Sequence, residues 1–502
     1  MSAIDDVLGN AAPLVAQTPW RRVAADAAAW DRAGRALAAG EASLLGLWGE
    51  RGVVHLALLA AESGEIAVLS LDASAGGFPS LGRVHPPAIR LERAIKDLFG
   101  LEPQGAPDAR PWLDHGRWGI AAPLGAAAPA GAPAAYPFLP VEGESLHQIP
   151  VGPIHAGIIE PGHFRFTANG EAVVRLEERL GYVHKGIEGL MQGEGLERGA
   201  KLAGRVSGDS AVAYAIAFAR AAEDALGVAA PPRAQWLRAL MAELERLANH
   251  LGDIGAICND AAFPLMHAHC GALRERVLRA ADAAFGHRLM RDCVVPGGVA
   301  LDLAAKGRAA IHAMMDIVRR EFPGLVRLYD ETASLQDRTV GAGIVDPALA
   351  AQFGVGGYVG RASGRGFDAR CRPGYPPYDR LTFAVPRRSE GDVNARVWIR
   401  IGEVEQSLDL IAQLIDGLPE GPHAIELPRA HAAEGLALVE GFRGDILVWL
   451  RLDAAGRIAR CHLRDPSWFQ WPLLEAAIEG NIVADFPLCN KSFNCSYSGH
   501  DL

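Results

Sequence analysis

The chain has 502 residues, of which 50% are hydrophobic and 22% charged, as in ordinary globular proteins with a large core and roughly two to four domains. A formal charge of −10 argues against a nucleic-acid-binding protein, which would need a basic face. No run of about 18 apolar residues is present, so we expect no direct membrane span, and the stretch MSAIDDVLGN lacks the basic region of a secretory signal.

The first predicted elements form a small α/β domain over residues 1–122. The segments VVHLALLAA (53–61) and EIAVLSLDA (65–73) have the β-branched and apolar content of strands. Six apolar residues between Ile89 and Phe99 lie on one helical stripe, and Gly100 supplies a C-cap. Residues 123–149 follow as an Ala/Pro/Gly-rich linker, because repeated prolines prevent a helix and favour an extended tether.

The second domain is predicted over residues 150–502. Residues 163–181 indicate a β-hairpin, since Asn169-Gly170 is a strong signal for a two-residue turn. Helices are then predicted over 204–227, 233–259 after Pro231-Pro232, 270–291, 308–335 and 394–418, where apolar residues recur every three or four positions. The predicted fold class is therefore α+β, with a small α/β domain followed by a mostly helical bundle and peripheral β-hairpins.

The seven cysteines, at 258, 270, 293, 371, 461, 489 and 495, include no Cys-x-x-Cys pair. Their odd number and their scatter argue against a disulfide framework and against a zinc or iron–sulfur site on this chain. We therefore expect reduced thiols, as in a cytoplasmic protein. Direct NAD binding is unsupported, because no Gly-x-Gly-x-x-Gly follows a predicted strand.

Four stretches, in order, resemble the large subunit shared by nickel–iron hydrogenases and respiratory complex I. They are GPIHAGIIEPGHFRF with LGYVHKGIEGL, then GRVSGDSAVAYAIAFARAAE, then QDRTVGAGIVDPALAAQFGVGGYVGRASGRGFDAR, and finally VEGFRGDILVWLRLDAAGRIARCHLRDPSW with the tail CNKSFNCSYSGHDL. The segment FPSLGRVHPPAIRLERAIKDLFGLEP resembles the 30-kDa subunit of complex I. Such a fusion is typical of hydrogenase-4 and formate hydrogenlyase large subunits, so residues 1–122 are expected to be 30-kDa-like and residues 150–502 to be 49-kDa-like.

The resemblance implies a metal site that has lost its ligands. In the hydrogenases two Cys-x-x-Cys pairs hold nickel and iron, because thiolates are soft, charged donors. The first pair falls here on Ser207 and Ser210, and the family's following histidine falls on Tyr214. An ungapped alignment of the tail puts the second pair on Ser496 and Gly499. We therefore expect no metal on this chain and a tail that plugs against the loop at 207–210.

A rescued metal site remains an alternative, built from Cys489, Cys495, Asp209 and His500. A quinone-type pocket is another implication, because complex I holds a quinone headgroup in the same cavity with a histidine and a tyrosine. Gly152-Pro153-Ile154-His155 matches the histidine motif, although a structural loop histidine is equally compatible. The tyrosine position falls on Gly208, and helical periodicity turns Tyr214 away from it. The candidate pocket residues are His155, His163, Asp209 and Tyr214.

Two residues are candidate catalytic groups by resemblance. Glu188 falls where the hydrogenases place a proton-relaying glutamate, and burial would raise the pKa of such a carboxyl; a solvated helix carboxylate is the alternative. Arg443 matches an arginine that lies over the metal site, where its charge would stabilise a reduced species. Asp209 is free to pair with Arg205 or with Arg443.

A charge-dense group lies in an otherwise apolar, helical region. Buried charges need partners, so this group forms either structural or interface ion pairs or a proton path toward a membrane arm. Its members are Arg361, Asp368, Arg370, Asp392, Arg396, Arg400 and Glu403.

The resemblance implies an electron-transfer subunit of a membrane-bound, complex I-like oxidoreductase, inactive alone. It would sit peripherally on the cytoplasmic face of the inner membrane, against a small subunit that carries a [4Fe-4S] cluster, and would meet antiporter-like membrane subunits indirectly. No cofactor is expected on this chain, and a quinone is the candidate ligand. A non-catalytic scaffold is the main alternative, and an active nickel–iron hydrogenase is disfavoured by the missing ligands.

Overall fold

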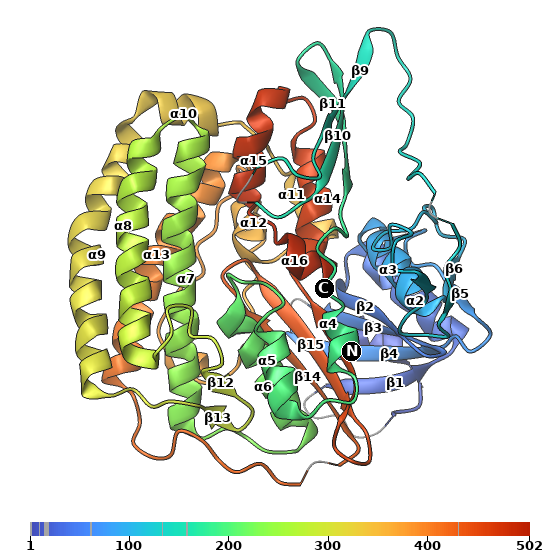
Figure 1. The fold of residues 1–502 in the computed structure, drawn as a ribbon, viewed down its shortest axis with the longest axis horizontal. Coiled ribbons are helices and arrows are strands. Elements are labelled where there is room, and N and C mark those ends of the chain that lie inside the picture. Colours follow the sequence, from blue (N-terminus) through green and yellow to red (C-terminus); the bar gives the residue numbers. More distant parts are fainter. Residues whose placement is uncertain are drawn as a thin grey trace.

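The computed structural model describes residues 3–9, 11–14, 20–60, 63–132, 134–156, 159–429 and 431–502. A helical bundle forms one half of the molecule and an α/β part forms the other, with the C-terminal helix α16 (Tyr497–Asp501) lying between them (Figure 1). Among the described helices, none is both long and apolar enough to cross a bilayer.

The N-terminal part is a four-stranded sheet in the order β1-β4-β3-β2. Its strands are β1 (Arg21–Ala25), β2 (Ser43–Glu50), β3 (Val53–Ala60) and β4 (Glu65–Asp72), with β1 parallel to β4 and the others antiparallel. Helices α1 (Ala3–Leu8), α2 (Ala27–Ala39) and α3 (Ile89–Phe99) accompany the sheet. The two predicted strands and the predicted helix are confirmed, and Gly100 ends α3 with a left-handed φ of 71°.

The predicted linker follows an extended course but is held at several points. Short strands β7 (Ile120–Ala121) and β8 (Ala128–Pro129) pair near its start, and β9 (Leu146–Val151) begins inside it. The Arg93 guanidinium donates to the Tyr136 hydroxyl at 2.7 Å, and the Leu139 amide donates to Glu177 at 2.9 Å. The segment therefore lies against both parts of the molecule.

The predicted hairpin is confirmed as β10 (His163–Asn169) and β11 (Ala172–Arg179), which form a three-stranded sheet with β9. Asn169 pairs with Ala172, so the two-residue turn is Gly170-Glu171, one residue later than predicted. Gly170 takes the positive φ of 60° that this turn requires. The sheet projects from the molecule beside the linker (Figure 1).

The helical bundle is also confirmed. Its long members are α7 (Pro232–Asp260), α8 (Pro264–Phe285), α9 (Ala305–Glu331) and α13 (Val393–Asp416), and the shorter ones are α4 (Ile187–Met191), α5 (Leu196–Ala203), α10 (Ala333–Thr339), α11 (Pro347–Gln352) and α12 (Gly357–Ala362). Helix α6 (Ala211–Ala225) begins seven residues later than predicted, because residues 204–210 form a loop instead.

The C-terminal sheet corrects one detail of the prediction. Strands β14 (Ala433–Glu440), β15 (Asp445–Leu452) and β16 (Ile458–Arg464) are almost wholly buried at the centre of the molecule and are not peripheral. Helices α14 (Ser467–Ala477), α15 (Phe486–Phe493) and α16 follow them. Short strands β5 (Gly77–Pro79), β6 (Glu102–Gln104), β12 (Val294–Val295) and β13 (Gly298–Val299) complete the described sheets.

The N-terminal and C-terminal sheets share a hydrophobic core. Trp48 of β2 lies against Trp449 of β15, with ring centroids 5.6 Å apart, and Ile66 and Val68 of β4 belong to the same buried cluster as Leu447. The two parts on either side of the linker are therefore packed together, which the composition of the linker did not indicate.

Candidate functional site

The site forms where the loop at 204–210 meets the C-terminal tail. Ser207 Oγ lies 2.8 Å from Ser496 Oγ, and the Ser207 hydroxyl donates to Asp209 Oδ1 at 2.8 Å. Ser496 caps α16 by accepting the Gly499 amide at 2.9 Å. All three serines at the positions that the resemblance aligns with metal ligands are buried, and the predicted packing of the tail against this loop is confirmed.

Arg443, in the turn between β14 and β15, ties the loop to the tail. Its guanidinium pairs with Asp209 at 2.5 Å and donates to Ser210 Oγ at 3.2 Å, while Nε donates to the Asn494 carbonyl at 2.6 Å. Burial would raise the pKa of Asp209, but Arg443 outweighs it and lowers this pKa. Arg205 instead pairs with Asp292 on the surface. Of the two arginines predicted as partners of Asp209, the structure therefore pairs it with Arg443.

Tyr214 belongs to the wall of this site, contrary to the expectation from periodicity. Its hydroxyl donates to Asp465 Oδ2 at 2.6 Å, and both side chains are buried. Burial, and then the Asp465 carboxylate, raise the pKa of Tyr214. A Cβ added at Gly499 would overlap Asp465 Oδ2, so a larger residue there would force the Asp465 carboxylate to shift. Asp465 was missed, although the Asp-Pro pair in RDPSW was a usable signal.

The two candidate histidines lie in different places. His155, on the half-buried loop after β9, has its Nε2 3.3 Å from the Tyr497 hydroxyl of the tail. His163, at the start of β10, has its Nδ1 3.3 Å from the Gly152 carbonyl and its ring beside Phe138 of the linker. Burial lowers the pKa of His163. The structure therefore places His155 beside Tyr497 of the tail. Tyr497 was not predicted as a site residue. His163 lies elsewhere, beside the linker.

Glu188 is neither a solvated carboxylate nor one with a raised pKa. It is 3% exposed and pairs with Arg460 at 2.8 Å and with His462 Nδ1 at 2.8 Å, both on β16. Burial would raise its pKa, but Arg460 and His462 lower it to about 2. The carboxylate is therefore charged at neutral pH, the opposite of the state expected for a proton relay.

The alternative metal site is not assembled. Burial raises the pKa of Cys489 to about 12 and that of Cys495 well above its usual range, so both thiols are protonated near neutral pH. His500 lies 2.9 Å from Asp501 and accepts from the Trp112 indole. Within the described ranges, no group of three or more His, Cys, Asp or Glu side chains has the geometry to hold a metal. Three hydroxyls and a glycine do not fit a nickel–iron centre, which takes thiolates.

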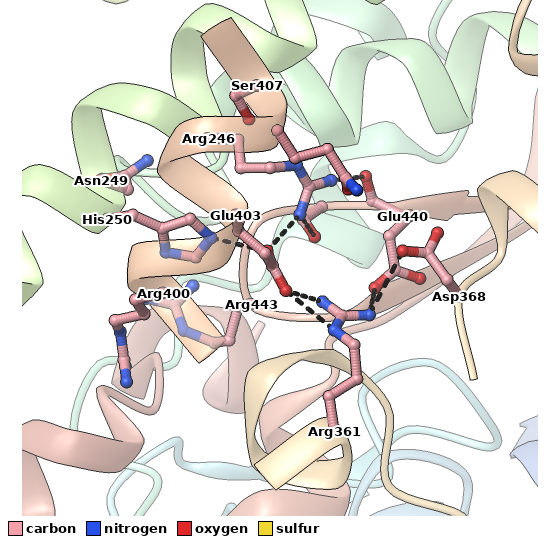
Figure 2. Close-up of polar contacts among 12 residues, drawn as sticks. Arg246, Asn249, His250, Arg361, Asp368, Arg400, Glu403, Ser407, Glu440 and Arg443 are labelled. Atoms are coloured by element: carbon pink, nitrogen blue, oxygen red, sulfur yellow. Dashed lines mark hydrogen bonds and ion pairs between the residues drawn. The ribbon is translucent and has the colours of Figure 1, made fainter. Parts of the chain in front are cut away.

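A second buried polar region lies beside the site (Figure 2). This buried charge cluster consists of side chains that are at most 2% exposed and that pair with one another. Its members are Glu243, Arg246, His250, Arg361, Asp368, Arg370, Glu403 and Glu440.

Glu403 of α13 is at the centre of the buried charge cluster. Its carboxylate accepts from Arg361 at 2.8 Å, from Arg246 at 3.3 Å and lies 2.7 Å from His250 Nε2. Burial would raise the pKa of Glu403, but Arg361 and the other neighbours hold it well below the usual range. These contacts make the cluster a set of structural ion pairs inside the chain, not an interface.

The remaining members of the predicted charge group lie outside the cluster. Asp392 caps α13 by accepting the Ala395 amide at 2.7 Å. Arg396 donates to the carbonyls of Gly391 and Gly343, and Arg400 donates to the Ser492 carbonyl at 2.7 Å. They hold the loops and α15 around the site.

Glu440 is the titratable member of the cluster. It accepts from Arg361 at 3.0 Å and from the Ala369 amide at 2.9 Å. Burial, followed by the Asp368 carboxylate, raises its pKa to about 7. Since the cluster holds three arginines and four carboxylates, one protonated carboxyl with a neutral His250 would balance the charge.

Comparisons with known proteins agree with both parts of the fold. The family described as "Respiratory-chain NADH dehydrogenase, 49 Kd subunit" matches residues 262–435, and the corresponding "30 Kd subunit" family matches residues 42–133. Formate hydrogenlyase subunit 5 of Escherichia coli is 32% identical over 86% of this chain and 78% of its own length. Hydrogenase-4 component G of the same organism is 31% identical over 89% and 80%.

A solved structure is similar as well. It is described as the membrane-bound sulfane sulfur reductase, an archaeal respiratory membrane complex. The matching chain superposes with a TM-score of 0.68 and 26% identity, over 72% of this chain and 100% of its own.

Proposed function

Because the chain belongs to the family of large subunits that includes those of formate hydrogenlyase and hydrogenase-4, with 30-kDa-like and 49-kDa-like parts fused, we propose that it is an electron-transfer subunit of a membrane-bound, complex I-like oxidoreductase. At the positions that hold nickel and iron in the hydrogenases, this chain would instead bind an electron acceptor. The acceptor is either soluble or carried in the membrane. A quinone-type acceptor is the first candidate, since His155 and Tyr497 offer hydrogen-bonding groups beside the tail.

The observation that carries the proposal is the Arg443–Asp209 pair. Arg443 is 2% exposed and joined to both the loop and the tail, so a positive charge is held in a fixed position inside the site. Reduction of a quinone adds two electrons and two protons, and negative charge develops on the carbonyl oxygens before the protons arrive. A buried guanidinium stabilises such charge more than water does, because the surroundings are already oriented and of low dielectric.

The electrons would come one at a time from a partner small subunit that carries a [4Fe-4S] cluster. We place the subunit peripherally on the cytoplasmic face of the inner membrane, with antiporter-like membrane subunits reached through its neighbours. The membrane-bound relatives support the association with a membrane complex. The sulfane sulfur reductase adds a second acceptor class, since a reduced sulfur species is also anionic and would be stabilised by Arg443.

The test uses the intact complex with Arg443→Gln and Arg443→Lys. Removing one charged donor from a site of developing charge lowers turnover by about 100-fold or more, and lysine restores part of it. Arg205→Gln is the matched control, because Arg205 forms an exposed pair with Asp292 near the same loop. Electron transfer to an added quinone or to polysulfide is measured alongside subunit content and nickel per chain.

A non-catalytic scaffold is the second candidate. The direct contact between Ser207 and Ser496 favours it, because the tail occupies the space between the former ligand positions. Unchanged electron flow in an intact Arg443→Gln complex would establish the scaffold. Stoichiometric nickel together with hydrogen evolution would instead establish a working hydrogenase.

A further inference from the structure

A cavity of about 860 Å³ lies under the linker, apart from the site described above. Residues within 111–118 of the N-terminal part, 130–132 and 134–138 of the linker and 163–184 around the hairpin contribute to its wall. None of Ser207, Asp209, Arg443 or Ser496 lines it. Its size is in the range of cavities that take a ligand or an inserted segment.

The cavity wall is positively charged. Arg117, Arg165 and Arg179 line it, and the described residues provide no ion-pair partner for any of the three. Arg179 is 3% exposed, yet it donates only to the backbone carbonyls of Trp112 and Asp114. Asp114 is the one carboxylate of the wall. Since the whole chain carries a net charge of −10, this local excess of positive charge stands out against its background.

Two further observations indicate a missing occupant. His163, 8% exposed, lines the cavity with its Nε2 buried and without a hydrogen-bond partner among the described residues. Two large apolar side chains here are exposed: Tyr182, which lines the cavity, at 38%, and Ile154, which follows the lining residue Pro153 in the chain, at 85%. Arginine and aromatic side chains next to exposed apolar surface are typical of protein–protein interfaces.

We propose that this cavity receives an acidic segment of a partner subunit, whose carboxylates pair with Arg117 and Arg165 while its apolar side chains cover Tyr182 and Ile154. Arginine pairs with carboxylates through two parallel hydrogen bonds, which gives both affinity and a fixed orientation. The inference rests on the proposed function, because it takes the chain to be a subunit of a larger complex.

The first experiment isolates the complex through a tag on the full-length chain and compares wild type with Arg117→Glu/Arg165→Glu. We expect at least a tenfold loss of one co-purifying subunit, with a smaller loss for Arg165→Lys, which keeps the charge but not the two parallel hydrogen bonds. Arg179 is left intact, because it holds backbone carbonyls. Arg276→Glu, an exposed charge reversal on α8, is the matched control and retains the subunit.

The second experiment places a photo-crosslinking amino acid at Tyr182 in the same complex and identifies the attached peptide by mass spectrometry. A partner peptide containing Asp or Glu supports the proposal, and reversal of those charges restores assembly of Arg117→Glu/Arg165→Glu. A crosslink to a peptide without acidic residues overturns it. The proposal is also overturned if inorganic phosphate binds to the isolated wild-type chain, the double variant abolishes this binding, and the complex still assembles.

The two proposals fail differently. If the wild-type chain co-purifies with no other subunit, the proposed function fails and the inference with it. If the wild type and the double variant assemble equally well, only the acidic docking site is overturned.

Discussion

The buried charge cluster and the site at the C-terminal tail lie next to each other but hold their charges differently. In the cluster, Glu403 is shared by two arginines and a histidine that are all buried inside the chain. At the site, Asp209 has one arginine partner, two serine hydroxyls and a side chain that is 35% exposed. The ring of Phe442 lies between them, 5.9 Å from His250 and 4.6 Å from the Arg443 guanidinium.

This difference distinguishes residues that maintain the fold from residues of the candidate site. A buried ion-pair network keeps its geometry only if every member is present, so the cluster fixes the relative positions of α7, α13 and β14. The site is held by a few hydrogen bonds between two short segments, and its residues can change without loss of the fold. Serine and glycine at the positions that the resemblance aligns with thiolates are therefore tolerable, whereas we expect replacement within the cluster not to be.

The largest expected effect is on the cluster. Glu403→Ala leaves Arg246 and Arg361 without this carboxylate in a water-free interior, which costs about 3–5 kcal/mol of unfolding free energy. Urea unfolding of the full chain measures it. Glu405→Ala, on the exposed face of the same helix, should change the unfolding free energy by less than about 0.5 kcal/mol. A cost below about 1 kcal/mol for Glu403→Ala would show that the cluster does not hold the framework.

The next effect concerns protonation of the cluster. Glu440 has its pKa raised from 4.5 to about 7, so its contribution to stability is full below pH 4.5 and is lost as the pH rises toward 7. The slope is up to about 1.4 kcal/mol per pH unit. Glu440→Gln removes this dependence, because the amide stays neutral.

The measurement is the difference in unfolding free energy between wild type and Glu440→Gln from pH 4.5 to 8. The unfolding free energy of the variant, relative to that of the wild type, should increase as the pH rises. Glu420→Gln, an exposed substitution, should show no such gain. A difference that is constant with pH would mean that Glu440 is charged throughout.

The third effect is at Gly499. Alanine there would place its Cβ against Asp465 Oδ2, and overpacking of this kind costs about 1–3 kcal/mol. Gly271→Ala on α8 has open space around its Cβ and should instead stabilise the chain by about 0.5–1 kcal/mol, because alanine favours a helix interior. Equal effects of the two substitutions on stability would mean that Asp465 does not lie against residue 499 in the wall of the site.

The long helices could be predicted from the sequence because their apolar residues recur along a single segment. The 29 residues of α7 carry their own periodicity and begin at the second proline of a pair. Strands β14 and β15 were not predicted, since both of their faces are buried and a continuous apolar run shows no alternation. The shared core of the two sheets joins Trp48 to Trp449, and no local pattern reports a contact of that range.

The site was predictable in its residues but not in its pairings. The resemblance located Ser207, Ser496 and Arg443, and the structure then joined them. The sign of the pKa shift of Glu188 was wrong, because its partners Arg460 and His462 lie more than 270 positions later in the chain. Burial alone argues for a raised pKa. Whether burial or the attraction of nearby positive charges has the larger effect depends on contacts that only the three-dimensional structure shows.

The smallest expected effect is the most informative about the tail. Ser207→Ala removes one donor to Asp209 and the contact with Ser496, while Asp209 keeps Arg443 and Ser496 keeps the Gly499 amide. The global cost is therefore only about 1 kcal/mol, as for a single hydrogen bond. If the tail is held mainly by this contact, hydrogen exchange at residues 496–502 should accelerate although the rest of the chain is unchanged. Ser334→Ala, exposed on α10, should leave exchange in the tail as it is. An unaltered tail in Ser207→Ala would mean that other contacts hold it, such as the Ser496 amide, which donates to Ser467 Oγ at 2.8 Å, and the Val183 amide, which donates to Asp501 at 3.0 Å.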